Sequence, residues 1–421
     1  MRYRLASTIA AVTLVVTSLV SAGDASPALA QTVTMSGVYS GPAVPAGVTN
    51  HDSFAGWLGD SVPYAVEFLD TNGSWDGIAN PYWALDAWSQ WSNAQPGRRL
   101  VLSVPLLVSS ASGQLAQGAA GAFDANFVTL SRNMVARNLG SSVIRLGWEM
   151  NHNGSPWWAG NDPASFRSFY ARVVTAMRSV PGAAFTFDWN PNLGVQGGSP
   201  LTTFDSFYPG DAYVDVIGLD IYDIKWMDST SDPAARWNWM MTQPLGLDQH
   251  RTFAAAHGKP VSFPEWGLYK KGDVLGGGGD NPYFVHAMAD WISSGNTTLE
   301  SYFNVDWGGG TLDSFPNAKA AYKLRFGASA TALTVSNVRV TALTSTSAVI
   351  TWTSSASATS EVDFGRSVPS TTVVGLNGVT SHTVTLVGLT RRTKYVYQVR
   401  SDSSTEDPAV SPVASFTTLR R

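Results

Sequence analysis

The amino-acid sequence predicts an α/β domain folded as a (β/α)8 TIM barrel, followed by a small all-β immunoglobulin-like sandwich. Its 421 residues are too many for one small domain. From Thr34 to about Phe326, short apolar strands alternate with amphipathic helical patterns, as they do in a barrel. After about Gly327, strands rich in Thr, Ser and Val follow one another without a helical period, which is typical of a sandwich.

Eight strands are expected in the first domain, each short, apolar and rich in β-branched residues. They lie near residues 35–39, 64–69, 100–106, 143–148, 184–189, 214–221, 260–263 and 299–305. The clearest helix between them begins with Asp162 as N-cap and Pro163 at the first helical position. An open doubly wound sheet is the alternative, but no Gly-rich phosphate loop follows the first strand.

The first thirty residues have the pattern of an export signal. Arg2 and Arg4 precede an apolar run, and Ala28-Leu29-Ala30 offers a small-residue cleavage site. We therefore expect a signal peptide at residues 1–30, the barrel at 31–327, a short linker at 328–331 and the sandwich at 332–421. The mature protein is expected to be secreted, extracellular and monomeric. No membrane association is expected after signal removal, because no later segment reaches about 18 apolar residues.

Charge and residue counts exclude several classes of protein. Charged residues make up 14% of the chain, the net charge is −4 and no run of Lys or Arg occurs, so nucleic acid is not expected as a partner. The absence of cysteine excludes thiol nucleophiles and thiolate metal sites. The six histidines form no H-E-x-x-H motif, and no G-x-S-x-G motif is present. We expect no metal, no cofactor and no serine nucleophile.

The segment Ser142 to Trp158, SVIRLGWEMNHNGSPWW, places a glutamate at the end of a strand. Its apolar start predicts a buried strand that the polar residues 151–154 cannot continue, so Glu149 lies at the changeover. A buried carboxylate costs on the order of several kcal/mol unless it is paired, which favours a functional role. The alternative is a structural ion pair with Arg145, four residues earlier on the same face.

A second segment, KPVSFPEWGLY from Lys259 to Tyr269, repeats this design with Glu265 after the strand at 260–263. Two glutamates that end two different parallel strands of one barrel can face each other across its mouth. Retaining glycosidases need such a pair, one carboxyl as nucleophile and one as acid and then base.

Polar or aromatic residues follow several other predicted strands. They are Glu67 and Asp70 at the end of the second strand, followed by Trp75, then Asp188, Trp189 and Asn190 at the end of the fifth, Asp220 and Tyr222 at the end of the sixth, and Asn304, Asp306 and Trp307 at the end of the eighth. Active sites of (β/α)8 barrels form at the carboxyl ends of the strands, so this distribution agrees with a barrel that carries its site there.

The two glutamate segments resemble known motifs. RLGWEMNHNGSPWW resembles the acid/base motif of glycoside hydrolase family 26, a family of retaining glycanases that includes β-mannanases. VDVIGLDIYD at residues 214–223 and FPEWG at 263–267 resemble its sixth-strand and nucleophile segments. The resemblance implies that Glu149 is the acid/base, Glu265 the nucleophile and Tyr222 a donor that orients Glu265. The family usually has histidine where this chain has Trp148, which puts mannan as the substrate in doubt.

Five tryptophans are candidates for contact with sugar. Trp157, Trp158 and Trp307 are expected to be platforms on which sugar rings stack, with core packing as the alternative. Trp148 and Trp189 are expected to support the substrate site.

Four polar residues complete the predicted site. Arg145 is expected to keep Glu265 ionised by Coulomb attraction, with a plain structural ion pair as the alternative. Asn151 and His152 are expected to bind sugar hydroxyls, although His152 could also cap its loop. Asp220 is expected to support the site from the sixth strand.

The C-terminal segment resembles a fibronectin type III module. Trp352, Leu389 and Tyr395 match the core tryptophan, the leucine and the tyrosine corner of that module. We assign no catalysis to it.

Two classes of function follow from the sequence. The first is an endo-acting retaining glycoside hydrolase of a β-linked polysaccharide, with β-1,4-mannan as first choice and glucan, xylan or a cell-wall polysaccharide as alternatives. The second is a catalytically silent carbohydrate-binding protein on a glycosidase barrel, because fold does not fix function.

Overall fold

The computed structural model describes residues 35–70, 72–195, 198–225, 228, 232–272, 275–327, 333–403 and 408–420. The predicted signal peptide at 1–30 and the predicted linker at 328–331 lie outside these residues. Within the described ranges, no helix is both long enough and apolar enough to span a lipid bilayer.

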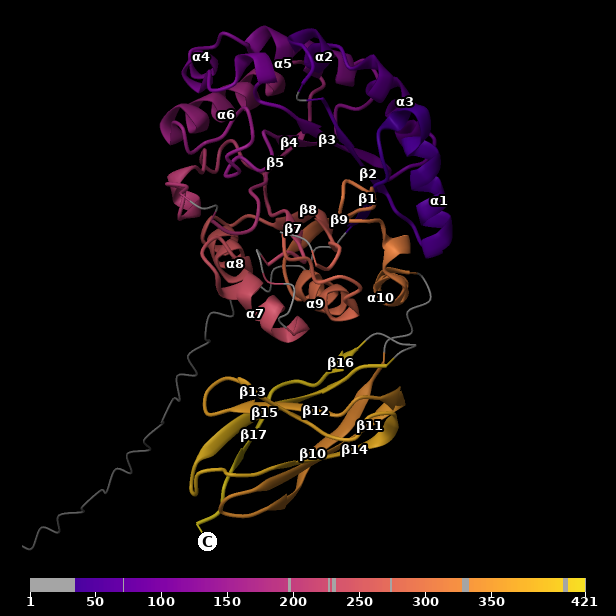
Figure 1. Cartoon of the computed structure of the whole chain (residues 1–421), viewed down its shortest axis with the longest axis vertical. Coiled ribbons are helices and arrows are strands. Elements are labelled where there is room, and N and C mark those ends of the chain that lie inside the picture. Colours follow the sequence, from indigo (N-terminus) through magenta and orange to yellow (C-terminus); the bar gives the residue numbers. More distant parts are fainter. Residues whose placement is uncertain are drawn as a thin grey trace, which may run out of the picture. The chain divides into compact units, whose positions relative to one another are not determined.

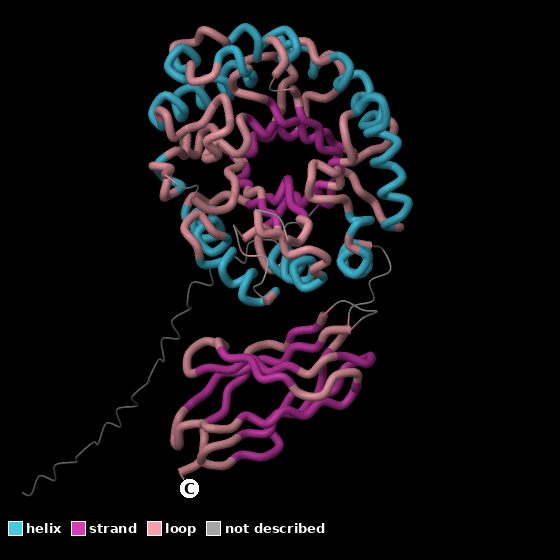
Figure 2. Tube along the Cα trace, in the orientation of Figure 1, coloured by secondary structure: helices cyan, strands magenta, loops and turns pink. Residues whose placement is uncertain are grey.

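The first domain is a closed barrel of parallel strands (Figures 1 and 2). Its strands are β1 (Met35–Tyr39), β2 (Tyr64–Phe68), β3 (Arg99–Val104), β4 (Val143–Leu146), β5 (Thr186–Trp189), β6 (Val216–Gly218), β7 (Ile221–Tyr222), β8 (Val261–Gly267) and β9 (Thr297–Phe303). They pair in the order β6-β5-β4-β3-β2-β1-β9-β8-β7, and a further pairing of β6 with β8 closes the ring. Because β6 and β7 both pair with β8 and are separated by two residues, they are two pieces of the sixth barrel strand. The prediction of an eight-stranded barrel is confirmed.

Helices cover the outside of the barrel, where Figure 2 shows them as a ring around the strands. They are α1 (Val48–Leu58), α2 (Trp75–Ala79), α3 (Tyr82–Asn93), α4 (Leu115–Ala119), α5 (Asp124–Val135), α6 (Pro163–Arg178), α7 (Pro233–Thr242), α8 (Leu247–Ala256), α9 (Pro282–Ser293) and α10 (Pro316–Phe326), with single turns at Ala43–Gly47, Ser109–Ala111, Phe204–Ser206 and Leu312–Ser314.

Helix α6 forms as its sequence predicts. The side chain of Asp162 accepts a hydrogen bond of 3.0 Å from the backbone N–H of Ser165, and Pro163 supplies a first-turn φ without an N–H to satisfy. Its buried side chains recur at helical spacing and pack against the barrel: Phe166, Phe169, Tyr170, Val173, Val174 and Met177. Helices α7 and α9 also begin with a side-chain cap followed by proline, Asp232 in α7 and Asn281 in α9.

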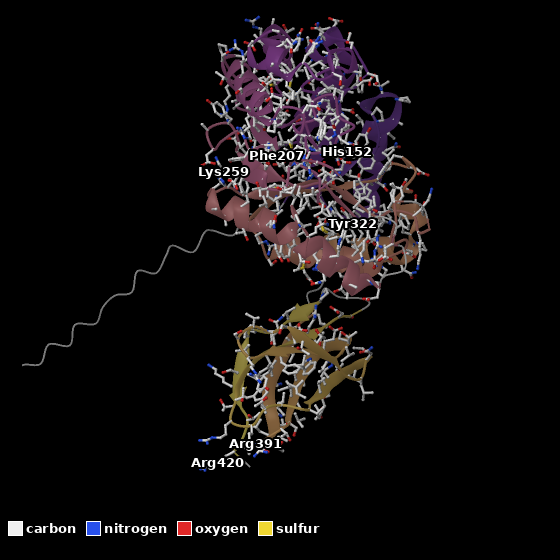
Figure 3. The ribbon with its side chains drawn as sticks, turned by 60° about the vertical axis from the view of Figure 1, so that its left-hand side comes forward. His152, Phe207, Lys259, Tyr322, Arg391 and Arg420 are labelled. Carbon is white, nitrogen blue, oxygen red and sulfur yellow. The ribbon has the colours of Figure 1, made fainter. Side chains whose placement is uncertain are left out.

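Apolar side chains from the strands and the helices form a buried core in the barrel domain, and Figure 3 draws the side chains as sticks. Phe207 and Tyr322, both labelled there, are fully buried in this core. The close packing gives the strand ends fixed positions on which a site can be built.

The seventh barrel strand, β8, differs from the prediction. Sequence reasoning ends it at Phe263, but β8 continues to Gly267 with Glu265 inside it. Its register against β9 shifts between Phe263, which pairs with Glu300, and Trp266, which pairs with Tyr302. One extra residue is therefore accommodated there, and such a bulge turns the neighbouring side chains.

The C-terminal domain is a sandwich of antiparallel sheets. One sheet holds β10 (Val335–Leu343), β11 (Ala348–Ala358) and β14 (Val379–Leu386), and the other holds β12 (Glu361–Gly365), β13 (Thr371–Val374), β15 (Lys394–Ser401), β16 (Ala409–Val410) and β17 (Ala414–Thr417). Trp352, Leu389 and Tyr395 lie in its core as expected. The hydroxyl of Tyr395 accepts a hydrogen bond of 3.0 Å from the N–H of Thr390, as a tyrosine at a strand corner does.

Candidate active site

A cleft of about 580 Å³ lies at the carboxyl ends of the barrel strands. The lining residues come from the ends of seven barrel strands and the loops that follow them, and from the α7 region. They are Tyr39, Phe68, Trp148, Glu149, His152, Asn192, Leu193, Gly194, Val195, Tyr222, Ile224, Trp239, Gln243, Glu265, Leu275, Phe303 and Trp307. Both predicted glutamates are among them. This is the end of the barrel at which (β/α)8 enzymes carry their sites.

A sharp turn after β4 aims Glu149 into this cleft. Gly147 has a φ of 55° and Glu149 itself has a φ of 48°, in the left-handed region that costs a non-glycine residue on the order of 1–2 kcal/mol. The backbone N–H of Glu149 donates to the carbonyl of Asn190 at 2.8 Å, and its carbonyl accepts from the N–H of His152 at 2.8 Å. These two hydrogen bonds hold the strained residue in place.

Glu149 is a weak acid. Burial raises its pKa from 4.5 to about 8, and the negative charge of Glu265 adds to the rise, whereas the guanidinium of Arg145 opposes it. Glu149 therefore holds a proton at neutral pH, as a general acid must.

Glu265 is held by two donors. The hydroxyl of Tyr222 donates to Glu265 Oε1 at 2.7 Å, and Arg145 Nη2 donates to Glu265 Oε2 at 3.2 Å. Its side chain is 11% exposed, so one part of the carboxylate faces the cleft. Each oxygen has a partner that fixes the orientation of the carboxylate plane.

Arg145 is fully buried beneath the two glutamates. Its Nη2 donates to Asp220 Oδ2 at 2.6 Å and to Asn190 Oδ1 at 2.6 Å, and its Nη1 donates to Ser103 Oγ at 3.0 Å. Asn190 Nδ2 donates in turn to Asp220 Oδ1 at 2.9 Å. The network links the ends of the third to seventh barrel strands, and it leaves Arg145 no rotational freedom.

This region of the barrel holds more carboxyl groups than cations. Glu265, Asp220 and Asp188 all act on the single guanidinium of Arg145. Burial raises the pKa of Asp188 to about 6, although Ser262 Oγ donates to its Oδ2 at 2.6 Å. An excess of buried negative charge favours the protonated form of a neighbouring carboxyl group.

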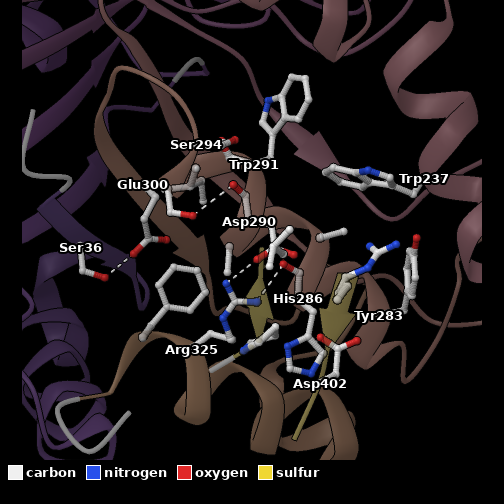
Figure 4. A pocket seen from close by; sticks show the side chains of 18 of the residues that line it. Ser36, Trp237, Tyr283, His286, Asp290, Trp291, Ser294, Glu300, Arg325 and Asp402 are labelled. Atoms are coloured by element: carbon white, nitrogen blue, oxygen red, sulfur yellow. Dashed lines mark hydrogen bonds and ion pairs between the residues drawn. The ribbon is translucent and has the colours of Figure 1, made fainter. Parts of the chain in front are cut away.

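Two other buried glutamates are structural: Glu67 near the end of β2 and Glu300 in the middle of β9. Glu67 accepts from Trp88 Nε1 at 2.8 Å and from the backbone N–H of Ala43 at 2.7 Å. Glu300 accepts from Ser36 Oγ and from Trp266 Nε1, the latter at 2.8 Å, and Figure 4 shows the contact with Ser36. Neither glutamate lines the cleft, and the carboxylate of Glu67 is held by Trp88 and by the backbone of Ala43.

The predicted tryptophans divide into two groups. Trp148 and Trp307 line the cleft, and the ring of Trp307 is 47% exposed beside Tyr222, at a centroid distance of 5.4 Å. The expectation of a platform at Trp157 is wrong, because its side chain is 1% exposed and its Nε1 donates to the carbonyl of Trp148. It supports Trp148 from below, with ring centroids 4.9 Å apart.

Trp158 and Trp189 also lie away from the cleft lining. Trp158 is partly buried, and an added Cβ at Gly160 would lie 2.4 Å from its ring. Trp189 is fully buried and packs against Phe207 and Tyr208, with centroids 5.0 and 5.1 Å apart. Both side chains therefore contribute packing, and the expected contact with substrate is not supported for either.

Asn151 and His152 have different places. Asn151 is buried, and its amide donates to the carbonyl of Asn192 at 2.7 Å and accepts from the N–H of Asn192 at 2.8 Å. The expectation that it binds hydroxyls is wrong, because these bonds use it to fix the loop after β5. His152, labelled in Figure 3, lines the cleft, and its Nδ1 accepts from the N–H of Gly154 at 3.1 Å. Burial lowers its pKa.

Several lining residues are absent from the sequence prediction. Tyr39, Phe68 and Phe303 sit at strand ends, so the strand-end rule could have found them. Ser103 does not line the cleft but accepts from Arg145 beneath it; it is the one polar residue in the run LVLSVPLLV, which is a signal in the sequence. Leu193, Val195, Ile224, Trp239, Gln243 and Leu275 lie in loops or on a helix outside any motif and carried no signal.

Among the described residues, no three His, Asp or Glu side chains lie close enough together to bind a metal ion. What the site offers is a protonated carboxyl, an oriented carboxylate and aromatic rings around one cleft. This combination on a (β/α)8 barrel is suited to acid-assisted displacement at a sugar acetal carbon.

Comparison with known proteins agrees with this class. The family model "Glycosyl hydrolase family 26" matches residues 136–236, which include Glu149 and Tyr222. The mannan endo-1,4-beta-mannosidase of Bifidobacterium adolescentis is 28% identical over 179 residues, 40% of this chain and 17% of that protein. The matched part thus spans less than a fifth of the curated relative. These matches confirm the resemblance to glycoside hydrolase family 26.

Among solved structures, two endo-beta-1,4-mannanases match with TM-scores below 0.5. The Cellulomonas fimi endo-beta-1,4-mannanase double mutant has a TM-score of 0.46 at 17% identity, covering 86% of this chain and 88% of that chain. The catalytic domain of the Bacillus sp. JAMB-750 GH26 endo-beta-1,4-mannanase has a TM-score of 0.46 at 19% identity, covering 65% and 80%.

The C-terminal domain matches a different model from the one expected. Residues 333–418 match "Purple acid Phosphatase, N-terminal domain". The sandwich is confirmed, and its resemblance to fibronectin type III stays a prediction.

Proposed function

We propose that this chain is a secreted, retaining, endo-acting glycoside hydrolase that cleaves a β-linked polysaccharide, with β-1,4-mannan as its substrate. The barrel at 31–327 is the catalytic domain and the sandwich at 332–421 is an accessory module. One observation carries the proposal: Glu149, with a pKa of about 8, shares a cleft with Glu265, whose two oxygens are held by Tyr222 and Arg145.

In the first step Glu149 is the general acid. Its proton passes to the glycosidic oxygen as that oxygen leaves, while Glu265 attacks the anomeric carbon from the opposite face. The C–O bond to the leaving chain breaks with its electron pair, and an ester between the sugar and Glu265 forms. Arg145 and Tyr222 orient the attacking carboxylate, which lowers the entropic part of the barrier.

In the second step the roles reverse. Glu149, now ionised, removes a proton from a water molecule whose oxygen attacks the anomeric carbon. The ester bond breaks, Glu265 leaves as a carboxylate, and two inversions give net retention at the sugar. As negative charge returns to Glu265, the pKa of Glu149 rises again, and it keeps the proton for the next cycle.

The choice of mannan rests on the relatives. The matching family model is that of glycosyl hydrolase family 26, and the printed name of the Bifidobacterium relative is that of an endo-acting mannosidase. A cleft with Trp148, Trp307 and Phe303 along its walls suits an internal segment of a polysaccharide, because sugar faces pack on aromatic rings.

The test is the release of reducing ends from β-mannan, glucan and xylan by the chain from residue 31 onward. Activity on mannan is expected, and Glu265→Ala should remove it while Asp248→Ala, an exposed carboxylate on α8, should not. Binding of mannan without cleavage by the unmodified chain would instead favour a catalytically silent carbohydrate-binding barrel. The first residue to test would then be Trp148, which stands where the family usually has histidine.

A further inference from the structure

The hydroxyl that orients Glu265 belongs to a strand of only two residues. In β7, Ile221 pairs with Trp266 of β8 and Tyr222 pairs with Gly267. Two residue pairs form few backbone hydrogen bonds, whereas strands in globular proteins usually run about five or six residues. The position of Tyr222 therefore depends on further contacts next to it.

Asp223, the next residue, is fully buried, and each of its polar groups has a partner. Its N–H donates to the carbonyl of Gly267 at 3.0 Å, and its carbonyl accepts from the N–H of Gly278 at 3.0 Å. Its carboxylate accepts from Arg236 Nε at 2.7 Å and from Asn281 Nδ2 at 2.7 Å. We call the three side chains Asp223, Arg236 and Asn281 the Asp223 anchor.

The donors of the Asp223 anchor come from two helices. Arg236 lies on α7, and Asn281 is the N-cap of α9. Arg236 is buried, and its Nη1 and Nη2 donate to the carbonyls of Asp228, Asp223 and Gly276 at 2.7 to 2.9 Å. The anchor thus joins the residue after β7 to two helices of the outer layer of the barrel.

Close packing surrounds both the anchor and the ring of Tyr222. An added Cβ at Gly278 would clash with Asp223 Oδ2, so glycine is needed where the chain passes the carboxylate. An added Cβ at Gly267 would lie 3.2 Å from Cε1 of Tyr222. The carboxylate and the ring therefore have little room to shift.

Stability alone does not account for a buried ion pair at this place. Taking two charges out of water costs a desolvation free energy that often exceeds their Coulomb attraction, and an apolar pair of similar volume is often as stable. Apolar side chains would not fix the direction of Asp223, whereas two charge-assisted hydrogen bonds of 2.7 Å hold both of its carboxylate oxygens. The anchor therefore supplies a fixed geometry next to Tyr222.

We propose that Arg236 and Asn281 are positioning residues for the reaction: they fix Asp223 and thereby keep the hydroxyl of Tyr222 aligned with Glu265 Oε1, 2.7 Å away. This inference rests on the proposed function, in which Glu265 attacks the sugar. Neither Arg236 nor Asn281 lines the cleft, so both act through Tyr222 and not by contact with the substrate.

The experiment is a double-mutant cycle on kcat for cleavage of β-mannan by the chain from residue 31 onward. Asn281 Oδ1 accepts from the N–H of Phe284 at 3.3 Å, and Asn281→Ser keeps a capping oxygen there while it removes the donor to Asp223. Since a misplacement of about 1 Å can cost about 100-fold in rate, a smaller shift of Tyr222 should lower kcat by roughly tenfold. KM should change by less than about twofold, because the lining of the cleft is kept.

The second arm repeats the change in a Tyr222→Phe background, which lacks the hydroxyl. There Asn281→Ser should lower kcat by less than about a further twofold, because its effect passes through that hydroxyl. A purely structural role would lower kcat by the same factor in both backgrounds, since the two changes would then act independently. Asp162→Ser, the same kind of change at the N-cap of α6, is the matched control and should leave kcat unchanged.

A roughly tenfold loss that disappears in the Tyr222→Phe background supports the positioning role. An equal loss in both backgrounds, or no loss in either, overturns it and leaves the glycanase proposal intact. No cleavage of mannan, glucan or xylan by the unmodified chain overturns the proposed function itself. If Asn281→Ser does not fold, Arg236→Lys gives the same readout, because lysine keeps the positive charge but lacks the planar fork of donors.

Discussion

Replacing Tyr222 by phenylalanine isolates one hydrogen bond of the site. The Tyr222 hydroxyl donates to Glu265 Oε1 at 2.7 Å, a short distance that is typical of a bond to a charged acceptor. Phenylalanine keeps the ring and its contacts with Trp307 and Phe303, at centroid distances of 5.4 and 6.1 Å. Such a bond contributes about 1.5–3 kcal/mol, so Tyr222→Phe should lower kcat by roughly 10- to 150-fold.

The assay is steady-state cleavage of soluble mannan, with thermal unfolding measured in parallel to show that the variant is folded. Tyr82→Phe is the matched control, because Tyr82 is 46% exposed on α3 and its hydroxyl donates to Asn80. That variant should keep full activity. If Tyr222→Phe lowers kcat by less than about threefold, the hydroxyl does not orient a reacting carboxylate, and Glu265 is not the nucleophile in the form described.

Three further predictions follow from the same structure. Because Glu149 must hold its proton for the first step and has a pKa of about 8, kcat/KM should stay level up to about pH 8 and fall tenfold per unit above it; a basic limb near pH 5 would contradict the assignment. Trp307→Ala removes a 47% exposed ring at the mouth and should raise KM roughly 3- to 10-fold with kcat nearly unchanged, and a loss confined to kcat would exclude a stacking role. Arg236→Met leaves Asp223 buried without its 2.7 Å partner and should lower the free energy of unfolding by about 3–5 kcal/mol in urea, whereas Arg178→Met at a surface pair should cost about 1 kcal/mol or less.

The barrel could be predicted because its signals are local. Strands of two to seven residues, proline after a capping Asp162, and a change of composition near Gly327 each depend on a few neighbouring residues. The strand predicted to end at Phe263 continues to Gly267. Pro264 has no N–H to donate and is rare inside a sheet, but here the chain passes it through a bulge that carries Glu265.

The candidate site could be predicted only in part. Glu149 and Glu265 could be identified because burying a charged side chain at the end of a buried strand is costly unless the charge is paired or has a function. Which tryptophan faces the cleft depends on the turn at Gly147, and sequence spacing did not reveal that Trp157 points into the core while Trp307 lies at the mouth. The position of Gln243 in the cleft could not be predicted from the sequence, because it depends on how the end of α7 packs against the loop at Gly194.

Capture of the covalent intermediate tests the central claim most directly. A 2-deoxy-2-fluoro mannosyl fluoride slows both steps and, with its good leaving group, lets the sugar ester accumulate on the nucleophile. Mass spectrometry of the digested protein should find one fluorosugar on the peptide that contains Glu265, and Glu265→Ala should remain unlabelled. A label on any other residue, or none while the same preparation cleaves mannan, would contradict the account.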